Sequence, residues 1–117
     1  MNNDDRSGNL IAWQWQSYGD AHRDRANLII HLLTVPLFAG GTLALPLALL
    51  ASPWLAPAGL AAMAAAVGLQ GRGHRREQTA PRPFRGPWDV VRRIFVEQWI
   101  TFPRFVLTGG PAARQAR

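Results

Sequence analysis

One long stretch of the sequence, residues 28–71, contains no Asp, Glu, Lys or Arg, and its only ionisable side chain is that of His31. At ~1.5 Å per residue, a helix of this length measures about 66 Å, roughly twice the ~30 Å hydrocarbon thickness of a bilayer. Two prolines and a serine near its middle are typical of a turn. The pattern therefore predicts a transmembrane helical hairpin over residues 28–70, with arms at Leu28–Leu50 and Trp54–Gln70.

The composition of the second arm leaves two interpretations open. Ala and Gly dominate this arm, and such small residues allow close backbone packing against the first arm in a membrane. Ala-rich helices also occur in the cores of soluble bundles, so a buried hairpin in a soluble protein is the alternative. Asn27 is a suitable N-cap for the first arm, in which Pro36 and Pro46 predict kinks.

Residues 7–24, before the hairpin, predict a short amphipathic helix that is capped by Ser7 or Asn9. Spacings of four, three and four residues align one stripe of this helix, which consists of Ile11, Trp15, Tyr18 and His22. Trp and Tyr settle at the depth of lipid headgroups, so we expect this helix to lie along the membrane surface. In a soluble protein the same stripe would pack on a helical core.

The chain after the hairpin predicts three further segments. Residues 71–87 form a His- and Arg-rich loop, because several Gly and Pro interrupt them. Residues 88–108 then predict an amphipathic helix, which Pro103 kinks or ends. Residues 109–117 form a short basic tail.

The helix predicted at residues 88–108 has two different faces. Its apolar stripe consists of Trp88, Val91, Phe95, Trp99 and Phe102. The opposite stripe, Asp89, Arg93 and Glu97, alternates in sign and predicts a solvated face. The sequence as a whole predicts one all-α domain over residues 1–117, a small integral membrane hairpin flanked by amphipathic interfacial helices.

The basic residues are all Arg, and ten of the 13 lie after Gly71. This segregation predicts contact with anionic lipids of the cytoplasmic leaflet. Nucleic acid is the competing partner of a basic tail, but no nucleic-acid motif accompanies it, so we expect none. Arg flanks both ends of the hairpin, and the positive-inside rule then places both termini in the cytoplasm.

Two further features of the composition narrow the class of protein. The first residues lack the basic start of a signal peptide, so we expect the hairpin to remain in the mature protein. The chain has no Cys, which excludes disulfides, thiolate metal sites and thiol nucleophiles. The oligomeric state does not follow from the sequence.

The predicted hairpin places all three histidines at the same membrane face. In one straight helix, His22 and His31 would lie ~13.5 Å apart on opposite sides, so their convergence requires a chain break near residues 25–27. Imidazoles bind Fe(II), Zn or Cu, and two His with one carboxylate form the non-haem iron site of oxygen chemistry. Glu77, three residues after His74, is the candidate carboxylate. Core or interfacial histidines with structural hydrogen bonds are the alternative.

Several sparse motifs follow one another in an order that is more specific than each motif alone. They are Tyr18-x3-His22-x4-Asn27-x3-His31, then Val35-Pro36, then Gln70-x2-Gly73-His74 with Glu77. The chain over residues 13–108 thereby resembles the family of small membrane proteins that includes the fungal 2-hydroxy fatty acid dioxygenase of phytosphingosine degradation. Residues 95–107 resemble the short bacterial branch of that family.

This resemblance implies an Fe(II)-dependent dioxygenase in the bacterial inner (plasma) membrane, with His22, His31 and His74 as metal ligands. The implied reaction uses molecular oxygen to shorten a lipid-derived 2-hydroxy fatty acid by one carbon, in an α-oxidation without 2-oxoglutarate. A metal at the bilayer surface would meet the substrate's carboxylate and hydroxyl at headgroup depth, while the acyl tail stays in the apolar hairpin.

Further roles are assigned around this predicted site. Glu77 is the candidate catalytic residue, and Asn27 and Gln70 are candidates for substrate binding. Arg75 and Arg76 are placed to pair with the carboxylate of the fatty acid. The alternative function is that of a non-enzymatic membrane interaction or scaffold protein whose histidines are structural.

Overall fold

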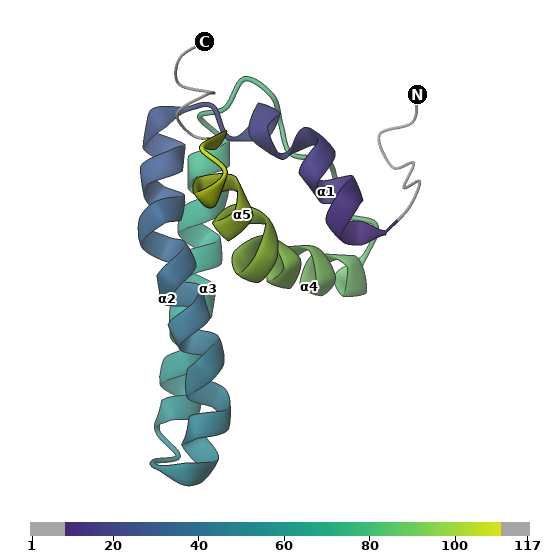
Figure 1. Ribbon diagram of the computed structural model, residues 1–117. Coiled ribbons are helices and arrows are strands. Elements are labelled where there is room, and N and C mark those ends of the chain that lie inside the picture. Colours follow the sequence, from purple (N-terminus) through teal and green to yellow (C-terminus); the bar gives the residue numbers. More distant parts are fainter. Residues whose placement is uncertain (1–8, 111–117) are drawn as a thin grey trace. The chain divides into compact units, whose positions relative to one another are not determined.

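The computed structural model describes residues 9–110, and every regular element in that range is helical, as predicted (Figure 1). The elements are α1 (Leu10–Tyr18), the 3-10 helix η1 (Gly19–Ala21), α2 (Arg25–Leu50), α3 (Leu55–His74), α4 (Pro87–Val96), the π-helix η2 (Glu97–Thr101) and α5 (Phe102–Leu107). They form two compact units: Ala26–Arg76 is one, and the parts of the chain before and after it form the other. Ser7 and most of the predicted tail lie outside the described residues.

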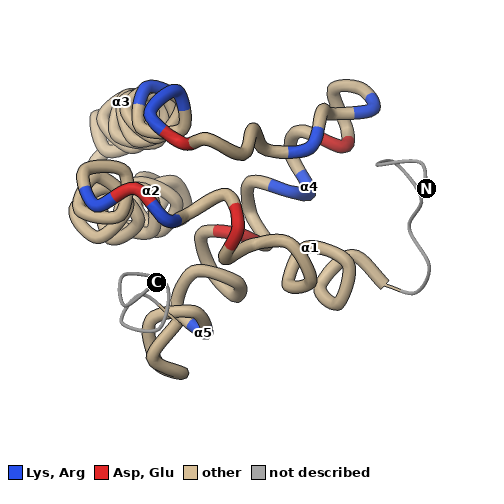
Figure 2. Tube along the Cα trace, turned by 90° about the horizontal axis from the view of Figure 1, so that it is seen from above, with Lys and Arg blue, Asp and Glu red and all other residues tan. Residues whose placement is uncertain are grey.

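In the unit Ala26–Arg76, α2 and α3 run side by side in opposite directions (Figures 1 and 2). The first helix ends at Leu50, as predicted, and a short turn leads into α3, in which the amide of Leu55 donates to the carbonyl of Ser52. α3 continues one turn beyond the predicted end at Gln70. Among the described helices, α2 alone is both long and apolar enough to cross a membrane.

The start of α2 differs from the prediction. Asn27 is not the N-cap, because the helix already begins at Arg25. The carboxylate of Glu77 accepts hydrogen bonds from the backbone amides of Arg23 and Asp24, directly before the first turn. A negative charge at the positive end of the helix dipole stabilises this start.

The two helices touch through their backbones at one pair of glycines. A Cβ atom added to Gly59 would lie 2.5 Å from the carbonyl oxygen of Gly41, and one added to Gly41 would lie 2.6 Å from that of Gly59. Nothing larger than hydrogen fits at this crossing. The small residues of the second arm therefore permit close packing, as the sequence predicted.

In the other unit, α1 begins at the predicted N-cap, since Oδ1 of Asn9 accepts a hydrogen bond of 2.8 Å from the amide of Ala12. The helix is shorter than predicted: it ends at Tyr18, and one turn of 3-10 helix follows. His22 comes after that turn, so it does not continue the helical stripe, and the chain break lies at residues 22–24. The 3-10 turn thus takes His22 off the helix.

The faces of α4 are the reverse of the prediction. Asp89 and Arg93 are buried, so they do not form a solvated face, whereas Trp88 of the apolar stripe is 69% exposed. Arg93 donates to the backbone carbonyls of Arg82 and Pro83 at 2.8 and 2.9 Å. Those carbonyls belong to a loop and have no amide of a regular helix to bond to. The buried guanidinium of Arg93 donates the hydrogen bonds that they require.

The helix continues through Pro103, and its direction changes between α4 and α5, which agrees with the predicted kink and not with a helix end (Figure 1). A proline clashes with the carbonyl four residues earlier in an α-helix. Here the preceding turn widens into η2, and the amide of Phe102 donates to the carbonyl of Glu97, five residues earlier. The side chain of Gln14 in α1 stabilises this turn through two hydrogen bonds. It donates to the carbonyl of Arg93 at 3.0 Å and accepts from the hydroxyl of Thr101.

Replacement of Gly59 by Ala tests the contact between α2 and α3. We expect Gly59→Ala to lower the free energy of unfolding by roughly 1 to 3 kcal/mol, because its methyl group meets a backbone oxygen that cannot rotate away. Thermal unfolding followed by circular dichroism measures the change.

Gly40→Ala and Gly68→Ala are matched controls, one in each helix. Nothing lies within 4 Å of a Cβ atom at either position. The higher helix propensity of Ala predicts unchanged or increased stability for both. Equal losses of stability in all three variants would contradict the close contact at Gly59.

Candidate metal centre

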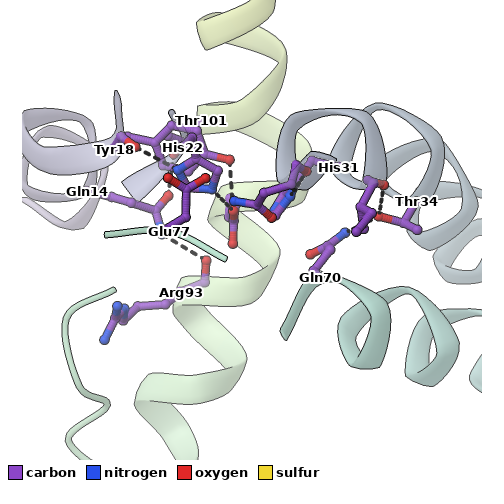
Figure 3. Close-up of polar contacts among 12 residues, drawn as sticks. Gln14, Tyr18, His22, His31, Thr34, Gln70, Glu77, Arg93 and Thr101 are labelled. Carbon is purple, nitrogen blue, oxygen red and sulfur yellow. Dashed lines mark hydrogen bonds and ion pairs between the residues drawn. The ribbon is translucent and has the colours of Figure 1, made fainter. Parts of the chain in front are cut away.

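His22 has a fixed orientation. Its Nδ1 lies 2.6 Å from the backbone carbonyl of Tyr18, and its ring is buried (Figure 3). A carbonyl oxygen only accepts hydrogen bonds, so Nδ1 carries the proton of the neutral ring. Nε2 is then the nitrogen with the lone pair, which is the atom that a metal requires.

Glu97 faces this nitrogen from the π-helix η2. Its Oε2 lies 3.3 Å from Nε2 of His22 and accepts a hydrogen bond of 2.8 Å from the hydroxyl of Tyr18. A lone pair and a carboxylate at this distance repel each other unless a positive charge accompanies them. A metal ion bound to both side chains would supply that charge.

Tyr18 remains a hydrogen-bond donor in this arrangement. Burial raises the pKa of its phenol well above the ordinary value, and the neighbouring charge of Glu97 raises it further. The ring stacks on His22, with the centroids 3.8 Å apart and the planes at 18°. Phe105 packs edge-on against Tyr18, with centroids 5.4 Å apart, and closes the cluster.

The unit Ala26–Arg76 holds a second pair of histidines. His31 is fully buried in α2, and its Nδ1 lies 3.0 Å from the carbonyl of Asn27. His74 is the last residue of α3, and its ring centroid lies 5.0 Å from that of His31, with the planes at 81°. Their ligand nitrogens lie within 4.8 Å of each other.

The donor chemistry of both pairs fits a divalent metal. Histidines that bind metals usually donate their second ring N–H to a backbone carbonyl or a carboxylate, which fixes the tautomer. His22 and His31 both make this contact with the carbonyl four residues earlier. Imidazole nitrogens together with one carboxylate are ligands for Fe(II) and Zn.

The predicted substrate-binding residues of the helix pair lie between α2 and α3. Oδ1 of Asn27 occupies the space where a Cβ atom of Gly73 would be, which explains the glycine directly before His74. Gln70 donates to the hydroxyl of Thr34 at 2.9 Å. These contacts give Asn27 and Gln70 structural roles, and their assignment to substrate stays a prediction.

Glu77 and the two arginines lie where α3 gives way to the following loop. Both carboxylate oxygens of Glu77 accept hydrogen bonds from backbone amides, at 2.9 to 3.0 Å. The catalytic assignment of Glu77 stays a prediction. Arg75 caps α3 through its backbone, and the side chains of Arg75 and Arg76 are exposed.

Sequence reasoning missed Glu97, which it placed on a solvated face. Glu97 bonds to Tyr18, a residue 79 positions earlier, and no local spacing reports such a contact. One usable signal was Pro103, because a proline inside a helical pattern can produce a π-turn, and such turns occur often at functional sites.

Comparison with known protein families, with curated proteins and with solved structures finds no match to this chain. The resemblance drawn from the motifs therefore stays a prediction.

Replacement of Glu77 tests its role at the start of α2. In Glu77→Ala we expect the amides of Arg23 and Asp24 to exchange hydrogen about 10- to 100-fold faster, because each loses a charge-assisted bond. Hydrogen–deuterium exchange followed by NMR measures this.

The matched control is Asp20→Ala, which removes a carboxylate paired with the guanidinium of Arg23. We expect this variant to leave the two amide exchange rates nearly unchanged. Wild-type exchange rates in Glu77→Ala would contradict the capping role.

Proposed function

We propose that this protein is an integral membrane protein that α2 and α3 anchor as a hairpin. The support comes from α2, because only 33% of its most apolar stretch is buried. The core helix of a soluble protein would be covered. Instead, large side chains such as Leu33 and Leu49 are 72% and 89% exposed, and lipid is the solvent that such a surface suits.

The distribution of charge supports one orientation of the hairpin in the membrane. In Figure 2 the charged residues of α2 and α3 lie at one end of the pair, the end that carries Arg25 and Arg72. The turn at the opposite end contains no charge and exposes Trp54. We place the charged end and both termini in the cytoplasm.

The reversed faces of α4 support an interfacial position for this helix. Its outward side chains include Trp88 and Val91, and Trp99 of η2 is also exposed. Arg85 and Arg92 are exposed near them. Aromatic rings next to arginines suit the headgroup layer of a bilayer that contains anionic lipids.

Extraction of membranes with alkaline carbonate tests this anchoring. We expect the protein to remain in the pellet, because removal of an apolar hairpin from lipid is costly. A matched peripheral protein should appear in the supernatant. Release of this protein by carbonate would contradict the transmembrane hairpin.

We propose further that His22, His31, His74 and Glu97 hold one Fe(II). The observation that carries this proposal is the contact that His22 and His31 share: Nδ1 of each lies at hydrogen-bond distance from the carbonyl four residues earlier, so Nε2 is the nitrogen that a metal would bind. The chain passes from one unit to the other after Arg25 and again after Arg76, a few residues from His22 and His74.

The proposed activity is a dioxygenase reaction on a lipid-derived 2-hydroxy fatty acid. The iron, when bound, supplies the oxygen chemistry that shortens the chain by one carbon. The polypeptide binds and orients the substrate: Arg75 or Arg76 pairs with its carboxylate, and the apolar helices hold its tail near the membrane. Asn27, Gln70 and Glu77 retain their predicted roles in this proposal.

The second candidate is a membrane scaffold protein with structural histidines. The contact between Nε2 of His22 and Oε2 of Glu97, at 3.3 Å, also fits a purely structural interaction. In that case Tyr18, His22 and Glu97 form a structural cluster, in which Glu97 lies beside His22 and accepts the hydrogen bond of Tyr18. Metal analysis distinguishes the two candidates.

Iron content and oxygen uptake test the proposed enzyme. Protein purified without oxygen and loaded with Fe(II) should bind about one iron per chain and consume oxygen with 2-hydroxypalmitate, forming pentadecanoic acid. We expect His22→Ala, His74→Ala and Glu97→Gln each to weaken iron binding at least ~10-fold, because each removes a ligand.

The matched control is Asp20→Asn. Asp20 belongs to the same unit as His22 and Glu97, and its carboxylate pairs with Arg23. It should retain full iron binding and oxygen uptake. Less than a stoichiometric fraction of iron in the wild type, or iron retained in both histidine variants, would overturn the metal centre. Stoichiometric iron without oxygen uptake would contradict the dioxygenase activity alone.

A further inference from the structure

Tyr18 contacts both side chains that its unit offers to the metal. Its hydroxyl donates to Oε2 of Glu97 at 2.8 Å, and its ring stacks on His22 with centroids 3.8 Å apart. Its backbone carbonyl also accepts from Nδ1 of His22 at 2.6 Å (Figure 3). One residue therefore holds His22 at two points and Glu97 at a third.

The position of Tyr18 is itself fixed. The side chain is buried, with 5% of its surface exposed, and Phe105 packs against its ring. Tyr18 is the last residue of α1, whose Gln14 is bonded to α4 and to η2. The hydroxyl thus comes from a rigid support, which is what an outer-sphere residue of a metal site requires.

The hydrogen bond distinguishes the two oxygens of Glu97. Oε2 accepts a hydrogen bond from the hydroxyl of Tyr18 at 2.8 Å, so part of its charge is already compensated. A carboxylate that is held in this way on one oxygen has the other, Oε1, as its stronger ligand for a cation. Without the hydroxyl, the carboxylate would lose this restraint.

We propose that Tyr18 is a positioning residue of the metal centre, which holds Glu97 through Oε2 so that Oε1 binds the ion. The inference rests on the proposed function, because it requires that His22 and Glu97 are metal ligands. Tyr18 itself does not bind the metal. It acts through the orientation of Glu97 and of the His22 ring.

Tyr18→Phe tests this role, because it removes the hydroxyl and keeps the ring that stacks on His22. Full-length protein in detergent is titrated with Co(II), whose visible spectrum reports the ligand geometry, and with Fe(II) against a chelator. We expect affinity for both metals to fall about 10- to 100-fold and the cobalt spectrum to change, as is typical for loss of an outer-sphere partner.

A double-mutant cycle separates positioning from a general structural effect. If Tyr18 acts through Glu97, Tyr18→Phe should have almost no further effect on metal affinity in a Glu97→Gln background. Equal effects in both backgrounds would contradict action through Glu97. Helix content by circular dichroism should be the same in all variants.

Thr108→Val is the matched control, since it removes a hydroxyl that donates to the carbonyl of Arg104 at 2.7 Å at the end of α5. It should leave metal affinity unchanged. If Tyr18→Phe has wild-type affinity and a wild-type cobalt spectrum, the inference is overturned and the metal centre stands. If the wild type binds neither metal, the proposed function fails as well.

Discussion

The candidate site depends on one repeated interaction, the hydrogen bond from a histidine Nδ1 to the backbone carbonyl four residues earlier. His22 makes it with Tyr18, and His31 makes it with Asn27. Because a carbonyl only accepts, each bond sets the tautomer and directs the lone pair of Nε2 to a defined place. The backbone thus sets the chemistry of the rings before any ligand binds.

A second regularity is that several polar side chains are buried in both units, while many large apolar side chains are exposed. In α2 the buried positions include His31 and Thr34, and in α4 they include Asp89 and Arg93. Several leucines and tryptophans, such as Leu33, Leu49 and Trp88, are exposed. In water this arrangement would expose apolar surface at high cost, whereas at a membrane it places each group in its preferred solvent.

The sequence predicted much of the helical framework, because strong local signals mark its limits. The charge-free run and its prolines indicated the end of α2 at Leu50, and Asn9 indicated the start of α1. It misassigned the faces of α4, because alternating charges are normally solvated and the loop carbonyls that bury Arg93 lie outside the helix. Glu97 was missed for a related reason: its partner Tyr18 is distant in sequence.

The central proposal is that His22, His31 and His74 bind one metal ion. X-ray absorption spectroscopy of the iron-loaded protein counts the imidazoles bound to the metal through their multiple-scattering pattern. The account predicts three imidazoles in the wild type and two in both His22→Ala and His74→Ala. The absence of imidazole ligands, or three imidazoles retained in either variant, would contradict it.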